Sequence, residues 1–119
     1  MSSAASAQQE RPSDQQLVAQ FNAMKQELSS IASKLGELEQ ERDEHKMVID
    51  TMTPLNSDRK CFRLINGVLV ERTVADVLPT LKTNTDNIEN IIGQLVSTYK
   101  KKEEEFVTFQ KKWNIQVKG

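Results

Sequence analysis

The sequence predicts a mainly α-helical fold, in which two long antiparallel helices form a coiled coil and one central β-hairpin connects them. Three observations predict this fold: two apolar repeats of equal length, one hairpin signal between them, and start and stop signals at the expected helix ends. Each repeat has eleven positions, spaced alternately by four and three residues, and nine of the eleven are apolar. We call these the seam positions: Leu17, Phe21, Met24, Leu28, Ile31, Leu35, Leu38, Arg42, His45, Ile49 and Met52 in the first repeat, and Leu78, Leu81, Thr85, Ile88, Ile92, Leu95, Tyr99, Lys102, Phe106, Phe109 and Trp113 in the second.

Equal length allows the two repeats to pair along their whole extent, with the position numbers of facing residues summing to 130. This register places Phe21 opposite Phe109 and His45 opposite Thr85. His45 is the only histidine, and no second histidine or cysteine lies near it in the sequence. We therefore interpret it as part of a polar layer that fixes the register, rather than as a metal ligand or catalytic group.

The first helix is expected over about residues 14–53. Ser13 and Gln16 have the spacing of a capping box, which satisfies backbone amides at a helix start. Pro54 ends the helix, because its ring disfavours a helical conformation in the preceding residue. The small and polar segment 1–12 has no periodicity, which is typical of a disordered tail.

A β-hairpin is expected over about residues 59–72. Asn66-Gly67 lies between two β-rich runs, and this pair is favoured in type I′ turns because both central residues need positive φ. Two strands alone are marginally stable in water and expose unpaired edges. Val68-Leu69-Val70 is apolar on both faces of its strand, so pairing with another chain is the economical solution.

The second helix is expected over about residues 74–115. Thr73 and Asp76 again have capping-box spacing. Pro79 cannot donate a backbone hydrogen bond, so we expect a short turn and a kink near this residue before the long helix.

Composition limits the class of function. The chain has 119 residues with a net charge of −1, so no strong field favours nucleic acid or an anionic membrane. No apolar run approaches the roughly 18 residues of a membrane span. Motifs of nucleotide-binding loops, serine hydrolases, zinc proteases and dithiol sites are absent from the sequence, so we expect no enzyme, cofactor or metal. Cys61 is expected to be a buried, inert thiol.

Four of the six aromatic residues lie at the helix ends remote from the hairpin. They could close the end of the coiled coil, or they could form an adaptable apolar surface that grips another chain. The pattern alone favours neither. The four residues are Phe21, Phe106, Phe109 and Trp113.

Two segments resemble β-type subunits of prefoldin, and among these the eukaryotic subunit 2 family: ELEQERDEHKMVID (37–50) and RKCFRLINGVLVERTVADVLPTL (59–81). The resemblance covers about residues 14–116, so residues 13–119 are expected to form one β-type domain. It implies a hexamer of two α-type and four β-type subunits, in which the hairpins join into β-barrels between subunits. Members of this family hold unfolded actin and tubulin at the ends of their helical arms and pass them to the cytosolic chaperonin without ATP.

The resemblance also implies two functional regions. One is an oligomerisation hairpin, comprising Phe62, Leu64, Ile65, Asn66, Gly67, Val68, Leu69 and Val70. The other is a client-binding end of the arms, comprising Leu17, Val18, Phe21, Met24, Phe106, Phe109 and Trp113.

We therefore expect a non-enzymatic holdase subunit whose partners are two α-type and three further β-type prefoldin chains, unfolded actin and tubulin, and the cytosolic chaperonin. Nucleic acid, membrane and cofactor are not expected as partners. The expected location is the cytoplasm, with the nucleus left open as a second compartment. The alternative is a structural coiled-coil scaffold that joins fixed native partners. A nucleic-acid module is least favoured, because no basic region precedes the repeats.

Overall fold

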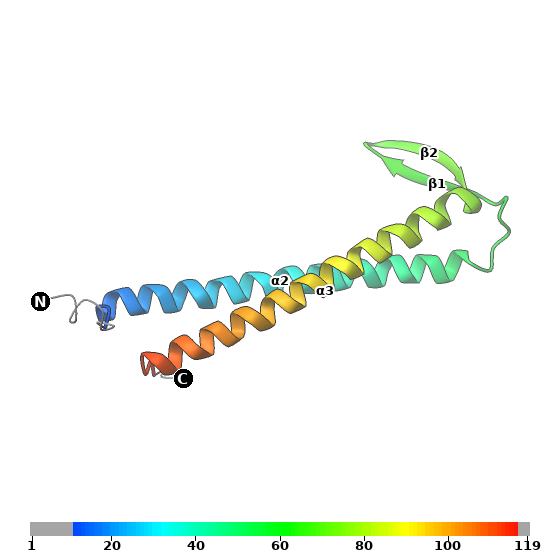
Figure 1. Ribbon diagram of the computed structural model, residues 1–119. Helices are drawn as coiled ribbons and strands as arrows, with labels where there is room; N and C mark the ends of the chain where they lie inside the picture. The colour runs from blue at the N-terminus through cyan, green and yellow to red at the C-terminus, as the bar shows by residue number, and fades with distance from the viewer. Residues whose placement is uncertain (1–10, 117–119) are drawn as a thin grey trace, which may run out of the picture. The chain divides into compact units, whose positions relative to one another are not determined.

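The computed structural model describes residues 11–116 and contains two long helices separated by a two-stranded antiparallel sheet (Figure 1). This arrangement confirms the predicted fold class. The tail predicted over residues 1–12 lies, for residues 1–10, outside the described residues. In chain order the elements are α2 (Asp14–Met52), β1 (Lys60–Ile65), β2 (Val68–Thr73) and α3 (Val74–Lys112).

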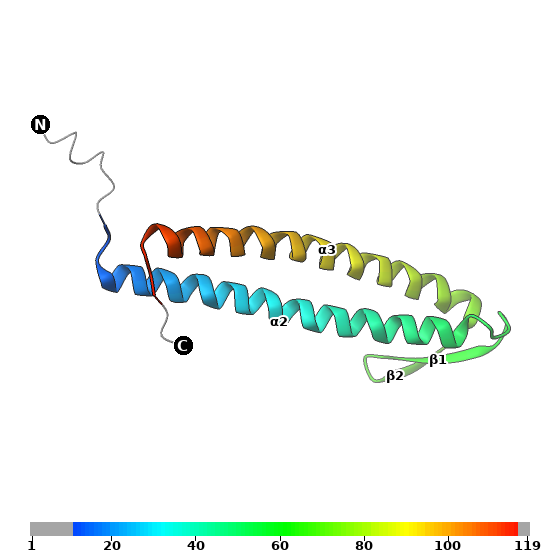
Figure 2. The ribbon, with the colours of Figure 1, turned by 90° about the horizontal axis from the view of Figure 1, so that it is seen from below.

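The chain divides into two compact units, each containing part of both helices. The hairpin unit is Lys34–Val96 and includes β1 and β2; Figure 2 shows the hairpin following the end of α2 and leading into α3. Of the described residues, the terminal unit combines 11–33 with 97–116. We describe each unit by itself.

Helix α2 begins with the predicted capping box. The backbone amide of Ser13 donates to Gln16 Oε1 at 3.0 Å, and the amide of Gln16 donates to Ser13 Oγ at 3.1 Å. The two residues thereby satisfy two amides that the helix start leaves without intrahelical partners. The helix ends at Met52, one residue before the expected end and two residues before Pro54.

The hairpin has the turn that Asn-Gly predicts. Asn66 and Gly67 have φ of 48° and 81°, as a type I′ turn requires. Ile65 pairs with Val68 next to the turn, and the ladder continues to the pair of Lys60 with Thr73. Because the turn contains only two residues, it fixes this register without slippage.

Helix α3 begins at Val74, directly after β2, so the separate turn expected before the helix is absent. Thr73 and Asp76 form the second capping box, with their reciprocal bonds at 3.5 and 3.3 Å. The helix continues through Pro79. The start at Val74 agrees with the expected start near residue 74. Pro79 removes one backbone hydrogen bond near a helix start that is otherwise well anchored.

That anchoring comes from the loop that precedes β1. The amide of Val74 donates to the carbonyl of Arg59 at 3.0 Å, and the amide of Ala75 donates to the carbonyl of Ser57 at 3.1 Å. Both amides lie in the first turn of α3, where the helix itself has no carbonyl that could accept their hydrogen bonds. The loop therefore stabilises the helix start on the N-terminal side of Pro79.

The two helices bury the predicted seam. Every one of the seam positions is buried or half-buried, although most other positions of α2 and α3 are exposed. The alternating three- and four-residue spacing thus identified the packed face of both helices.

One contact in the terminal unit differs from the predicted pairing. The ring of Phe21 contacts Phe106, with centroids 5.1 Å apart, where the predicted register placed Phe109 opposite Phe21. The position numbers of Phe21 and Phe106 sum to 127, not 130. At the other end of α3, Val74 is buried and precedes Leu78 by one helical turn, so it adds a packed position that the seam pattern did not include.

The two residues of the predicted polar layer, His45 and Thr85, both lie in the hairpin unit. Thr85 is buried and His45 is half-buried. Each polar side chain is satisfied within its own helix. His45 Nδ1 lies 2.8 Å from the carbonyl oxygen of Glu41, and Thr85 Oγ1 donates to the carbonyl of Leu81 at 2.8 Å.

Candidate functional site

The hairpin carries an apolar face that the chain does not cover. Side chains of directly paired residues lie on the same side of an antiparallel sheet, so Phe62, Leu64 and Leu69 share one face. Their exposed fractions are 66%, 68% and 67%. We call this the Phe62 face; it is the densest group of exposed large hydrophobic residues in the described chain.

The opposite face of the hairpin is partly covered. Val70 and Cys61 are half-buried, whereas Ile65 and Val68 remain exposed. Cys61 was expected to be buried and is not fully so; its Sγ lies 3.9 Å from the carbonyl oxygen of Arg59. We call this the Val70 face. The chain thus already covers part of one face and leaves the other to solvent.

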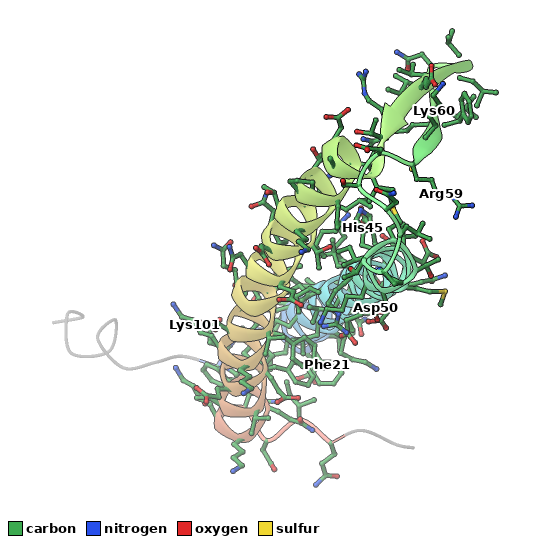
Figure 3. All side chains as sticks on the ribbon, turned by 90° about the vertical axis from the view of Figure 1, so that its right-hand side faces the viewer. Phe21, His45, Asp50, Arg59, Lys60 and Lys101 are labelled. Carbon is green, nitrogen blue, oxygen red and sulfur yellow. The ribbon has the colours of Figure 1, made fainter. Side chains whose placement is uncertain are left out.

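Charged residues mark the base of the Phe62 face. Lys60 Nζ lies 3.2 Å from Glu71 Oε1 across the two strands, and Figure 3 shows Arg59 and Lys60 where the chain enters the hairpin. Within residues 11–116 the two strands pair only with each other, so both outer edges keep free backbone groups. An apolar face with open edges is suited to addition of strands from another chain.

The seven residues predicted at the arm ends all belong to the terminal unit, but they differ in exposure. Leu17 and Phe109 are buried, so they close the helix pair. Phe21, Met24, Phe106 and Trp113 are half-buried. Val18 is 58% exposed and is the only one of the seven that is freely available to another chain in this structure.

Two shallow grooves flank these residues in the terminal unit. One, of about 640 Å³, is lined by Leu28, Tyr99 and Phe106 together with exposed Val107. The other, of about 580 Å³, is lined by Val18, Phe21 and Ile115 among others. Val107 and Ile115 were not predicted as site residues, since neither is a seam position. Their apolar character beside a seam end was the available signal.

The end of α3 forms a compact cap next to the second groove. Asn114 has φ of 51°, the amide of Ile115 donates to the carbonyl of Gln110, and the amide of Asn114 donates to the carbonyl of Lys111. This is a Schellman motif, which ends the helix at Lys112 rather than near residue 115 as expected. The cap holds Ile115 in its half-buried position.

One ion pair joins the helices within each unit. In the hairpin unit Lys46 Nζ lies 2.8 Å from Glu89 Oε1, and this hydrogen bond and the lysine charge lower the pKa of Glu89. In the terminal unit Lys102 pairs with Glu27, whose hydrogen bond and charge raise the pKa of Lys102. Lys102 therefore occupies its seam position with its ammonium group directed to a carboxylate.

Nothing in the described part of the chain resembles a reaction centre. No group of three or more histidine, cysteine or acidic side chains there could hold a metal ion. His45 lies on α2 (Figure 3), and its ring is bonded to its own helix. No described helix has both the length and the apolarity needed to cross a membrane.

Comparisons with known proteins agree with this geometry. The family described as prefoldin subunit matches residues 15–119. The probable prefoldin subunit 2 of Schizosaccharomyces pombe is 48% identical over 109 residues, covering 91% of this chain and 96% of that protein. Prefoldin subunit 2 of Homo sapiens is 45% identical over 107 residues, covering 90% of this chain and 70% of that protein.

A solved structure shares the fold. The crystal structure of the prefoldin beta subunit from Thermococcus strain KS-1 matches with a TM-score of 0.73 and 19% sequence identity. The match covers 92% of this chain and 100% of that chain.

Proposed function

Because the chain belongs to the prefoldin subunit family, whose members are non-enzymatic chaperone components, we propose that it serves in an ATP-independent holdase that captures unfolded proteins. Actin and tubulin are the proposed clients, and the cytosolic chaperonin is the proposed recipient. Family membership implies assembly with other prefoldin subunits. The proposed partners within the hexamer are two α-type and three further β-type chains.

One observation carries the proposal: the chain exposes apolar side chains in two separate regions with different geometries. The Phe62 face is a flat sheet surface with open edges, which suits permanent pairing with other hairpins. The terminal unit instead offers shallow grooves beside half-buried aromatic rings. Polar and charged residues also line both grooves, among them Lys25 and Glu104 in one and Arg11 and Asp14 in the other. The apolar part of each groove offers contact area without sequence specificity, as the capture of varied unfolded chains requires.

The proposed client surface consists of residues available without opening the helix pair. Val18 and Val107 are exposed in the terminal unit, each lining one of the two grooves. Leu17 and Phe109 are buried and are proposed to hold the grooves in shape instead.

The first experiment tests holding activity. The hexamer is reconstituted with this chain, and chemically denatured actin and an unrelated denatured protein are diluted into it without nucleotide. We expect suppressed light scattering for both and no binding of their native forms. A hexamer that binds one native protein and leaves both aggregation curves unchanged would instead support the scaffold.

The second experiment tests the client surface. A hexamer carrying Val18→Ser and Val107→Ser should capture less denatured actin while keeping its melting temperature, because both side chains are exposed. The matched control is Met47→Ser with Val48→Ser, two exposed apolar residues of the hairpin unit. Equal capture by the two variants would place the client surface elsewhere.

The proposed location is the cytoplasm, where the proposed clients and chaperonin meet, and the nucleus is the second compartment to be tested. Fractionation with an antibody to the endogenous chain tests this. Retention of transferred actin by the chaperonin, measured by native gel, tests the proposed delivery step.

A further inference from the structure

Two glycines occupy equivalent positions in the two helices of the hairpin unit. Gly36 lies within α2 and directly follows the seam residue Leu35, and Gly93 lies within α3 and directly follows the seam residue Ile92. Along both helices the glycines lie between the residues of two interhelical ion pairs, Lys46 with Glu89 and Glu27 with Lys102. The two glycines therefore lie at the same level of the helix pair.

Packing does not explain either glycine. A Cβ atom added at Gly36 or at Gly93 would meet no atom within 4 Å, and both positions are exposed. Neither has the positive φ that makes glycine necessary at Gly67. Alanine would fit at both sites, and in a helix interior it is favoured over glycine by a factor of roughly four to five. Both helices are thus weakened at one level without a steric reason.

Glycine lowers the cost of opening helical hydrogen bonds, because it gains more backbone freedom than any other residue when it leaves the helix. If only one helix had a weak point, the intact helix beside it would prevent bending. When both helices are weak at the same level, neither prevents the other from bending.

We propose that Gly36 and Gly93 form a flexible joint at which both helices open and bend locally while the seam on either side stays packed. The use of such a joint rests on the proposed function: it lets the terminal unit adjust to unfolded chains of different size. The joint itself is independent of any client.

Hydrogen exchange of the wild-type hexamer tests the joint, with rates expressed as protection factors to remove the intrinsic fast exchange of glycine. We expect a local minimum of protection over about residues 34–40 and 90–96, with higher protection on both sides. The variant carrying Gly36→Ala and Gly93→Ala should raise protection there by a factor of roughly four or more. The control variant carries Thr83→Ala and Asn87→Ala, two exposed helix positions outside these windows.

Three results would overturn the joint. Protection that rises evenly from the helix ends through these windows would show that no weak point exists. An equal gain from the control variant would show that general helix propensity, not the joint, sets the protection. Failure of the glycine variant to enter the hexamer would assign the glycines to a close contact with a neighbouring subunit.

The capture assay separates the two proposals. If the joint serves capture, the glycine variant should retain a small denatured client and lose capture of a large one, each compared with wild type. A wild-type hexamer that captures neither client would refute the proposed function and leave the exchange result standing on its own.

Discussion

Removing the leucine pair of the Phe62 face should disconnect this chain from the hexamer without unfolding it. Leu64 and Leu69 are directly opposite each other on β1 and β2, and each is about two-thirds exposed in the lone chain. Replacing both by alanine therefore removes little that holds the monomer together. The same change removes most of the exposed apolar area that a partner hairpin could cover at this position.

The magnitude follows from the exposed area. Full burial of a leucine side chain is worth about 1.5–3 kcal/mol, and about two-thirds of that remains available to an interface here. The double variant should therefore weaken association by roughly 2–4 kcal/mol, which corresponds to a ~30- to ~700-fold increase in the dissociation constant.

The assay is titration of the tagged variant into the remaining prefoldin subunits, with the bound fraction read by native mass spectrometry. Circular dichroism of the same variant should show unchanged helix content. The control variant carries Met47→Ala and Val48→Ala, which removes exposed apolar area from α2 in the same unit. A dissociation constant within about threefold of wild type for the leucine variant would refute the assembly role of the Phe62 face.

Three further substitutions test the remaining reasoning. Val70→Asp should reduce incorporation into the hexamer. Adding Arg63→Ala should reduce it further, because Arg63 is directly opposite position 70 and can pair with the new carboxylate. Equal recovery of the single and double variants in a pull-down with the other subunits would contradict this. His45→Leu should raise the melting temperature by about 4 °C or more, because an apolar side chain replaces a half-buried polar one in the seam. A lowered melting temperature would show that the hydrogen bond of the histidine ring to its own helix stabilises the protein more than the buried leucine does. The ion pair of Lys46 with Glu89 should stabilise the fold at pH values above the ordinary glutamate pKa of 4.5, and this stabilisation should be lost as the pH falls through the lowered pKa of Glu89. The melting temperatures at pH 6 and pH 3 should therefore differ less for Glu89→Gln than for wild type.

The sequence predicted those features that depend on local chemistry. The seam period identified the packed face of both helices, since a position one step off the seam points away from the neighbouring helix. Asn66-Gly67 predicted the turn, because few other residue pairs tolerate its backbone angles. The capping box at Ser13 and Gln16 likewise depends only on residues within one turn.

The register could not be predicted in this way, because it depends on contacts between distant segments. Carbonyls of the loop before β1 hold the first amides of α3, and this support allows the helix to start at Val74 despite Pro79. The spacing of the seam does not say which positions of the two helices face each other. The contact of Phe21 with Phe106 differs by one seam position from the pair that the summing rule predicts.

The candidate client surface was predicted as one group of residues at the arm end, but its members differ in exposure. Leu17 is buried, and the next residue, Val18, is exposed. The seam pattern separates these two residues, because Leu17 is a seam position and Val18 is not. The family resemblance named both without this distinction. The hairpin was easier, because a two-stranded sheet without a covering layer leaves its apolar face exposed whatever the register of the helices.

The Phe62 face and the terminal unit also differ in the apolar surface that each exposes to solvent in the unassembled chain. The Phe62 face combines open edges with three exposed large side chains, which makes it an aggregation hazard until other hairpins cover it. The terminal unit keeps its largest apolar groups in the seam and exposes only isolated valines beside its grooves. Scattered apolar residues of this kind are compatible with solubility, so the terminal unit can stay open to solvent whether or not the hairpin is covered. The proposed capture of unfolded chains requires a surface that stays open in this way.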